Sequence, residues 1–360
     1  MKKIVLAARG RFGFLKIAPL FSTLAANGLL EPVAALVVGD GEPEPEAPVL
    51  EAFGLGERLR RIPVEAGSPV VETASLMLAF ERLFAETAPD FVVPGGYDNA
   101  AVAAAISASR MGIPVVSLEA GLRSYDRSDP EELNRLLIDS VAAMHFVSEH
   151  SGVYNLINEG FPDDRILFAG NPTIDSLVAL IGGANRSEVL AALGVEPKRY
   201  ATVLLDMPLR TETSGNRELL CRVLEEIASS ATVLLPCGTM PDGGLQEAFG
   251  SIPGIRVLPM PGTVDLLRVL KESAFVLTDS EEFEAELTVM SVPCLSLRQG
   301  TCRPSTVEVG TNVIVGYDEP EILERAMVLL SGKPADKSLI PEKWDGASAK
   351  RIAEMLERAG

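Results

Sequence analysis

The chain has 360 residues, of which 47% are hydrophobic and 23% charged, so it is long enough for two domains and too apolar to be disordered. Its 50 acidic and 32 basic residues give a net charge of −18, which repels nucleic acids and anionic membranes. Four cysteines without a C-x-x-C spacing and only two histidines predict no metal site, and no apolar run reaches the length of a membrane span. We expect a cytoplasmic globular protein with no cofactor.

The first predicted elements are a strand, a glycine loop and a helix. Residues 3–8 form a short apolar run, residues 9–13 carry two glycines and two arginines, and residues 15–28 have a helical pattern. The loop contains no G-x-G-x-x-G motif, so a nicotinamide dinucleotide is not expected. Similar apolar runs, which alternate with helix-length segments, predict strands at 32–38, 91–94, 114–118 and 144–147. This alternation is typical of a parallel sheet buried on both faces.

A second α/β domain follows a glycine-containing stretch over residues 181–198. The alternation of short apolar runs with helical segments then restarts, and a helix is expected near the end of the sequence at 347–359. The strands of this half are predicted at 201–205, 231–235, 255–258, 274–278, 293–297 and 312–315.

Residues directly after strands are candidates for function, because ligands of open parallel sheets bind at the carboxyl ends of the strands. They are Arg11, Asp98, Glu119, Arg210 and Ser280. Arg11 lies in a loop that opens a helix, where it can bind phosphate, although a solvent-facing arginine explains it equally well. Glu119 is a candidate for acid/base chemistry, since it lies beside a glycine and Arg123 at a strand end.

Other polar residues have structural explanations. Asp129 is expected to cap a helix, and capping alone also explains Glu131 in the first turn. Asp279 and Glu282 have the spacing of a capping box. His145 lies in an apolar run and is expected to be a core histidine.

Several segments together resemble the non-hydrolysing UDP-N-acetylglucosamine 2-epimerases. The resemblance extends over most of the chain, in the family's order. It rests on Lys16-Ile17-Ala18-Pro19-Leu20, Glu119-Ala120-Gly121-Leu122-Arg123, Pro130-Glu131-Glu132-Leu133-Asn134-Arg135, Gly170-Asn171-Pro172-Thr173-Ile174-Asp175 and Leu277-Thr278-Asp279-Ser280.

The resemblance implies two Rossmann-like domains of the GT-B type with a cleft between them, and a homodimer. An N-terminal domain would span 1–180 and a nucleotide-binding domain 181–345, and a helix over 346–360 would return to the first domain. The family acts at C2 of a nucleotide sugar by eliminating UDP and adding it back. The implied catalytic residues are Glu119, Glu131 and Asp98, and the implied nucleotide-sugar-binding residues are Arg11, Arg123, Arg135, Arg210, Ser280 and Glu286.

The chain departs from the family pattern at four places, all within motifs that carry the chemistry. Tyr97 stands where the family has a catalytic aspartate, and Asp98 comes one residue late. Leu209 and Ser117 stand where the family has histidines. Because a missing general acid or base slows catalysis by about 10² to 10⁴, these changes predict weak or absent epimerisation.

The fourth departure replaces two glycines at a helix start by Glu281 and Glu282. A carboxylate about 5 Å from a phosphate charge costs about 3 kcal/mol at an effective dielectric constant near 20, so these acids are expected to repel a diphosphate. Three hypotheses follow: a nucleotide-sugar 2-epimerase, a catalytically degenerate relative with a binding or interaction role, and a protein with a changed, less anionic ligand.

Overall fold

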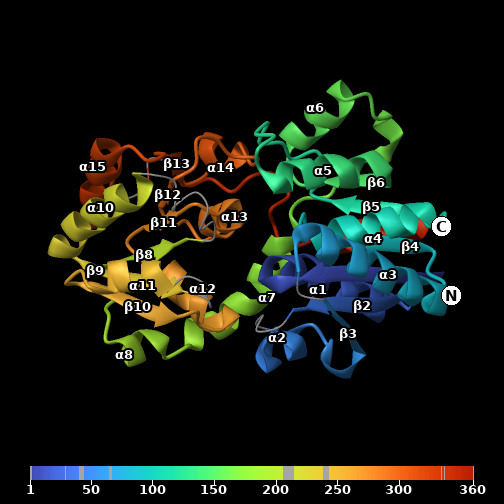
Figure 1. Cartoon of the computed structure of the whole chain (residues 1–360), viewed down its shortest axis with the longest axis horizontal. Coiled ribbons are helices and arrows are strands. Elements are labelled where there is room, and N and C mark those ends of the chain that lie inside the picture. The colour runs from blue at the N-terminus through green and yellow to red at the C-terminus, as the bar shows by residue number, and fades with distance from the viewer. Residues whose placement is uncertain are drawn as a thin grey trace. The chain divides into compact units, whose positions relative to one another are not determined.

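The computed structural model describes residues 2–28, 30–39, 44–64, 67–205, 215–237, 243–333, 335 and 337–359. The chain divides into two compact units, each built on a parallel sheet (Figure 1). Unit 1 contains Met1–Leu180 and Glu342–Gly360, and unit 2 contains Ile181–Pro341. The predicted α/β class with two parallel sheets is confirmed. Among the described residues, no helix is long and apolar enough to cross a membrane.

Unit 1 has a seven-stranded sheet in the order β3-β2-β1-β4-β5-β6-β7, so the strand order reverses between β1 and β4. Its strands are β1 (Lys2–Arg9), β2 (Leu30–Val38), β3 (Leu59–Pro63), β4 (Phe91–Pro94), β5 (Val115–Leu118), β6 (Ala142–Val147) and β7 (Ile166–Phe168). Its helices are α1 (Gly10–Asn27), α2 (Ala47–Ala52), α3 (Pro69–Thr87), α4 (Asn99–Arg110), α5 (Pro130–Val141), α6 (His150–Asn158) and α16 (Ser348–Ala359), with short 3-10 turns at Gly56–Arg58 and Asp163–Arg165. Helix α7 (Pro172–Arg186) begins in this unit and ends in unit 2.

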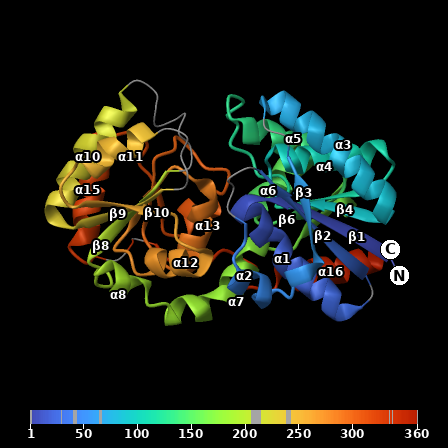
Figure 2. The ribbon, with the colours of Figure 1, turned by 60° about the horizontal axis from the view of Figure 1, so that its bottom comes forward.

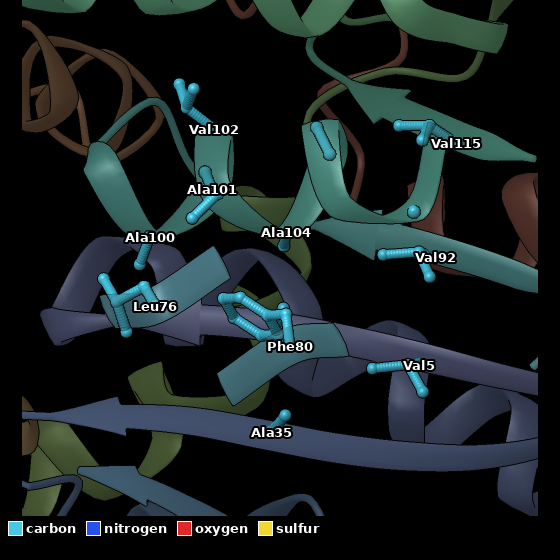
Figure 3. Packing of buried hydrophobic residues seen from close by; sticks show 14 of the residues in the cluster. Val5, Ala35, Leu76, Phe80, Val92, Ala100, Ala101, Val102, Ala104 and Val115 are labelled. Carbon is cyan, nitrogen blue, oxygen red and sulfur yellow. The ribbon is translucent and has the colours of Figure 1, made fainter. Parts of the chain in front are cut away.

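One face of this sheet packs against α3 and α4 (Figure 3). Small alanines of α4 let the helix approach the strands, while Leu76 and Phe80 of α3 fill the remaining space. Side chains alternate along a strand, so Val5 and Ala7 of β1 face this cluster and Ile4 and Leu6 point to the other face.

Helices α1 and α16 lie side by side in unit 1 (Figure 2). The Asp175 carboxylate accepts the N–H groups of Ser348 and Ala349 at the start of α16, at 3.1 and 2.8 Å. Just before this helix, the buried indole of Trp344 donates to the Ser148 oxygen at 2.9 Å. The segment 342–359 is therefore an integral part of unit 1.

Unit 2 has a six-stranded sheet in the order β10-β9-β8-β11-β12-β13, and its strand order reverses between β8 and β11. Its strands are β8 (Tyr200–Leu204), β9 (Thr232–Cys237), β10 (Ile255–Pro259), β11 (Val276–Thr278), β12 (Cys294–Ser296) and β13 (Asn312–Ile314). Its helices are α8 (Val189–Leu193), α10 (Asn216–Ser230), α11 (Gly243–Gly250), α12 (Thr263–Lys271), α13 (Glu281–Val289), α14 (Ser305–Glu308) and α15 (Glu319–Leu330). Residues of α10 and α15 join those of the strands in one apolar cluster.

The strand at 91–94 is found where it was predicted, and the other predicted strands are found within a few residues. Two edge strands, β3 and β7, were missed. The sequence of β3 is Leu-Arg-Arg-Ile-Pro, and only its leucine and isoleucine are buried, so it contains no apolar run. β7 has only three residues, all partly exposed. Apolar runs nevertheless predicted β10 and β13, the edge strands of unit 2, so an edge position alone does not explain why β3 and β7 were missed.

Candidate functional site

The carboxyl ends of β1, β4 and β5 are neighbours in the unit 1 sheet, where the strand order reverses. Here the first turn of α1 approaches the turn after β4 so closely that only glycine fits. A Cβ atom on Gly95 would lie 2.5 Å from Ile17 Cγ2 and 2.7 Å from the Gly13 oxygen. Arg11 lies in this turn of α1, partly buried, with its guanidinium carbon 4.8 Å from the centre of the Phe12 ring.

Glu119, the first residue after β5, forms a buried ion pair with Lys16 of α1. Its Oε2 lies 3.0 Å from the lysine Nζ, and the two side chains are 0% and 2% exposed. Glu119 also has a φ of 51°, a left-handed conformation that costs a residue with a side chain about 1–2 kcal/mol. Such strain gathers at functional positions when the surrounding structure holds it in place.

Tyr97 connects the groups around Glu119. Its hydroxyl donates to the main-chain oxygens of Glu119 and Leu118 at 2.9 and 3.2 Å, which pins the strained residue. Its ring centre lies 4.6 Å from Lys16 Nζ and 5.0 Å from the guanidinium carbon of Arg135. Tyr97 therefore contacts the main chain of Glu119 through its hydroxyl and two cations through its ring.

Helix α5 contributes Glu131 and Arg135 to this edge. Arg135 is buried and pairs with Glu131 and Glu132, both at 3.3 Å. The Glu131 side chain is 48% exposed, so solvent and solutes reach its carboxylate. Asp129 caps the helix by accepting the Glu131 N–H at 3.0 Å, as predicted.

Asp98 caps α4, accepting the Ala101 N–H at 2.9 Å. Burial raises the pKa of its carboxyl above the ordinary value, although this hydrogen bond and the charges of Arg9 and Lys16 act in the opposite direction. The carboxyl groups predicted to be catalytic thus lie on one edge of unit 1, with Glu119 and Glu131 joined through Tyr97 and Arg135.

Arg123 is engaged within unit 1. It pairs with Asp139 at 2.8 Å and with Glu159 at 2.7 Å, and its side chain is 1% exposed. Ser117 donates to the same aspartate at 2.7 Å. His145 is fully buried, with Nε2 2.9 Å from the Asp139 oxygen, so the prediction of a core histidine is confirmed.

In unit 2, α13 begins at the carboxyl end of β11, and Ser280 is its N-cap residue. The Ser280 side chain makes no capping hydrogen bond, and its own N–H donates to Thr278 Oγ1 at 3.1 Å. The predicted capping box of Asp279 and Glu282 is wrong, because the helix begins one residue later and the Glu282 carboxylate pairs with Arg303 instead.

Both acids at the start of α13 meet arginines from the segment after β12. Glu281 Oε1 lies 2.8 Å from Arg298 and accepts the Cys302 N–H at 3.1 Å. Glu282 lies 3.2 Å from Arg303. Because these arginines offset the two carboxylates, the expected repulsion of a diphosphate is weaker than the sequence suggested.

A third acid of α13, Glu284, is fully buried and accepts hydrogen bonds from Ser296 and Thr301 at 2.8 and 2.6 Å. Burial raises its pKa to about 7, and the charge of Glu281 acts in the same direction. Glu286, one turn later than Glu282, is also buried. Arg210 and Leu209 lie outside the described residues.

Sequence reasoning assigned no role to Lys16, Arg298 or Arg303. Lys16 is a single lysine inside an apolar helical run, which marks it as buried and in need of a partner. Arg298 comes two residues after β12, so the strand-end rule applied to that strand would have found it, whereas Arg303 lies seven residues beyond the strand and carries no such signal. Within the described residues, no cluster of histidine, cysteine, aspartate and glutamate side chains could hold a metal ion.

Comparison with known proteins agrees with this fold. A UDP-N-acetylglucosamine 2-epimerase of Methanocaldococcus jannaschii is 28% identical over 309 residues, covering 81% of this chain and 82% of that protein. A UDP-2,3-diacetamido-2,3-dideoxy-D-glucuronate 2-epimerase of Pseudomonas aeruginosa is 27% identical over 311 residues, 86% of each chain. The crystal structure of the Methanocaldococcus jannaschii UDP-GlcNAc 2-epimerase in complex with UDP-GlcNAc and UDP superposes with a TM-score of 0.86, at 24% identity, over 99% of this chain and 100% of that one.

The family model described as UDP-N-acetylglucosamine 2-epimerase matches residues 42–357, which is most of the sequence. Sequence and fold therefore agree, and the chain belongs to the UDP-N-acetylglucosamine 2-epimerase family.

Proposed function

We propose that the protein binds a UDP-sugar and acts at its C2 carbon by eliminating UDP and adding it back. Family membership supports the ligand and the reaction. The observation that carries the proposal is the group of acids Asp98, Glu119 and Glu131 at one edge of unit 1, with Lys16 and Arg135 beside Tyr97.

The reaction removes the C2 proton and returns a proton to the opposite face of the ring, so it needs acid and base groups near the sugar. Glu131 is the most exposed of the three acids, and its ion pair with Arg135 orients it. The raised pKa of Asp98 brings it toward the range useful for proton transfer. In this proposal Glu131 and Asp98 exchange protons with the substrate, and the Glu119–Lys16 pair supplies fixed charge beside them.

For nucleotide binding, we assign Ser280, Glu286 and Arg210 of unit 2. Arg123 and Arg135 are each 1% exposed, and each pairs with two carboxylates. These contacts favour a structural role for both residues, and Arg135 holds the Glu131 carboxylate in place.

A second candidate function, nucleotide-sugar binding without turnover, is favoured by Tyr97. Its hydroxyl proton is committed to two main-chain oxygens, so the phenol does not replace a carboxylate base. Ser117 likewise gives its hydroxyl proton to Asp139. These contacts lock both positions into the structure of unit 1.

One experiment separates the two functions: incubation with UDP-N-acetylglucosamine in D₂O, with deuterium at C2 read by NMR and mass spectrometry. We expect slow exchange, about 10² to 10⁴ below that of an epimerase with all its acid/base groups. Exchange should vanish in Glu131→Gln and persist in Glu81→Gln, a control on the exposed face of α3. Calorimetric binding without exchange would instead establish the second function. Neither binding nor exchange would refute both.

A further inference from the structure

Tyr97 lies in the turn between β4 and α4, and its side chain belongs to the interior of unit 1. The turn that carries it is fixed on both sides. The Tyr97 main-chain oxygen accepts a hydrogen bond from Asn134 Nδ2 of α5 at 2.7 Å, and the next residue, Asp98, caps α4. A buried ring on a fixed turn has little freedom to move. Tyr97 can therefore act as a rigid support for the groups that it touches.

The hydroxyl of Tyr97 supports the main chain of Glu119. A left-handed conformation such as that of Glu119 persists only where the surrounding structure enforces it. The hydroxyl holds the Glu119 oxygen at 2.9 Å. Two residues later, the Gly121 N–H donates to the buried Asp139 carboxylate at 3.0 Å. The turn after β5 is thus held at both places, and its main chain sets the direction in which the Glu119 side chain leaves it.

The ring of Tyr97 supports two cations, Lys16 and Arg135. Both lie within the range of cation–π attraction, and both are almost fully buried, so the ring stabilises their charges where water cannot. Lys16 pairs with Glu119 at 3.0 Å. Arg135 pairs with Glu131 at 3.3 Å. A change in the ring therefore reaches both glutamates through their cationic partners.

The family pattern has an aspartate at position 97, so family membership does not assign this role. An ionised aspartate accepts hydrogen bonds and has neither a ring nor a donor group. The support that Tyr97 gives to a main-chain oxygen and to two cations is therefore a property of this chain.

We propose that Tyr97 is a positioning residue of the candidate site. Its hydroxyl holds the Glu119 main chain, and its ring holds the cationic partners of Glu119 and Glu131. This inference rests on the proposed function, because the two glutamates matter for turnover only if the chain acts on a UDP-sugar. A displacement of a catalytic group by about 1 Å can slow a reaction about 10²-fold, so the role of Tyr97 should affect turnover more than ligand affinity.

The test compares Tyr97→Phe, which removes only the hydroxyl, with Tyr97→Leu, which also removes the ring. Tyr200→Phe is the matched control, because this buried tyrosine of unit 2 also donates its hydroxyl to a main-chain oxygen, that of Val269 at 2.6 Å. Deuterium exchange at C2 of UDP-N-acetylglucosamine gives kcat and KM, and urea unfolding gives the stability of each variant.

We expect kcat to fall about threefold to tenfold in Tyr97→Phe and by more than about tenfold in Tyr97→Leu, while KM changes less than about threefold. Tyr200→Phe should lose stability and keep the kcat of the parent. An unchanged kcat in Tyr97→Leu, or an equal fall of kcat in Tyr200→Phe, would overturn the proposal.

Crystal structures of the parent and of both Tyr97 variants test the positioning without turnover. The Glu119 carboxylate should move by more than about 0.5 Å in Tyr97→Leu, which exceeds the tolerance of a catalytic group. A Glu119 carboxylate that stays in place in both variants would refute the role of Tyr97. Absence of exchange in the parent would instead refute the proposed function, and the position of Glu119 in the crystal structures would then decide the role of Tyr97.

Discussion

Both units have acidic residues at the carboxyl ends of their strands, but these acids pair with different kinds of partner. In unit 1 the Glu119 carboxylate pairs with Lys16 from the helix after β1, and the ring of Tyr97 lies close to both Lys16 and Arg135. In unit 2, glutamates of one helix hold the chain segment after β12 through Arg298 and Arg303. At both edges the acids pair with cations of the same unit. In unit 1 the ion pair lies beside the Tyr97 side chain, and in unit 2 the ion pairs hold a loop.

These two arrangements show how three residues that depart from the family pattern are accommodated in the fold. The ring of Tyr97 lies close to two cations, Lys16 and Arg135, and the two glutamates of α13 lie against two arginines. These three residues each have a physical partner close by, so they belong to a consistent structure.

The largest predicted effect is a loss of stability of unit 1 when the buried Glu119–Lys16 pair is broken. Lys16→Met leaves the Glu119 carboxylate buried without its cation, which should lower the free energy of unfolding of unit 1 by about 3–5 kcal/mol. The fluorescence of Trp344, the only tryptophan in the sequence and buried in this unit, reports its unfolding in urea. The double variant Lys16→Met with Glu119→Gln should recover part of the loss. A loss below about 1 kcal/mol in the single variant would show that the pair contributes little.

The second prediction is that the stability of unit 2 depends on pH. The pKa of Glu284 is about 7, against an ordinary value of 4.5, so between these pH values the folded chain holds a proton that the unfolded chain has released. Unit 2 should therefore lose stability as the pH rises from about 5 to 7, by about 3 kcal/mol from this group.

Hydrogen exchange of the amides of β11 and β12 at several pH values, corrected for intrinsic exchange, measures this loss. Glu284→Gln should flatten the pH profile, while Glu225→Gln, a change on the exposed face of α10, should leave it as it is. An unchanged slope in Glu284→Gln would place the titrating group elsewhere.

The smallest predicted effect is a change in UDP affinity when the acids at the start of α13 are neutralised. Glu281→Gln with Glu282→Gln removes two negative charges, while the new amide oxygen at 281 still accepts the Cys302 N–H. The arginines then lack their counter-ions, so UDP affinity should rise about tenfold at low salt, and the gain should shrink with added salt. Calorimetry of this variant and of Glu225→Gln with Glu226→Gln, an exposed pair on α10, is the measurement. Equal gains in both would point to net charge alone.

The sequence predicted the α/β alternation because apolar runs reflect burial, which is a property of each segment by itself. The Asp129 cap was also predictable, since its partner lies two residues away. The Glu119–Lys16 pair and the Glu282–Arg303 pair were not, because they join residues far apart in the chain. A carboxylate at a helix start has the same local pattern whether it caps the helix or reaches an arginine from another loop.

The return of residues 342–359 to unit 1 has a consequence for folding during synthesis. Unit 2 is one continuous stretch, so it can form as soon as it leaves the ribosome. Unit 1 begins first but completes its structure only when Trp344 and α16 arrive to cover it. Until the end of the chain is synthesised, unit 1 therefore stays incomplete. During that time the surface of α1 that later contacts α16 is uncovered.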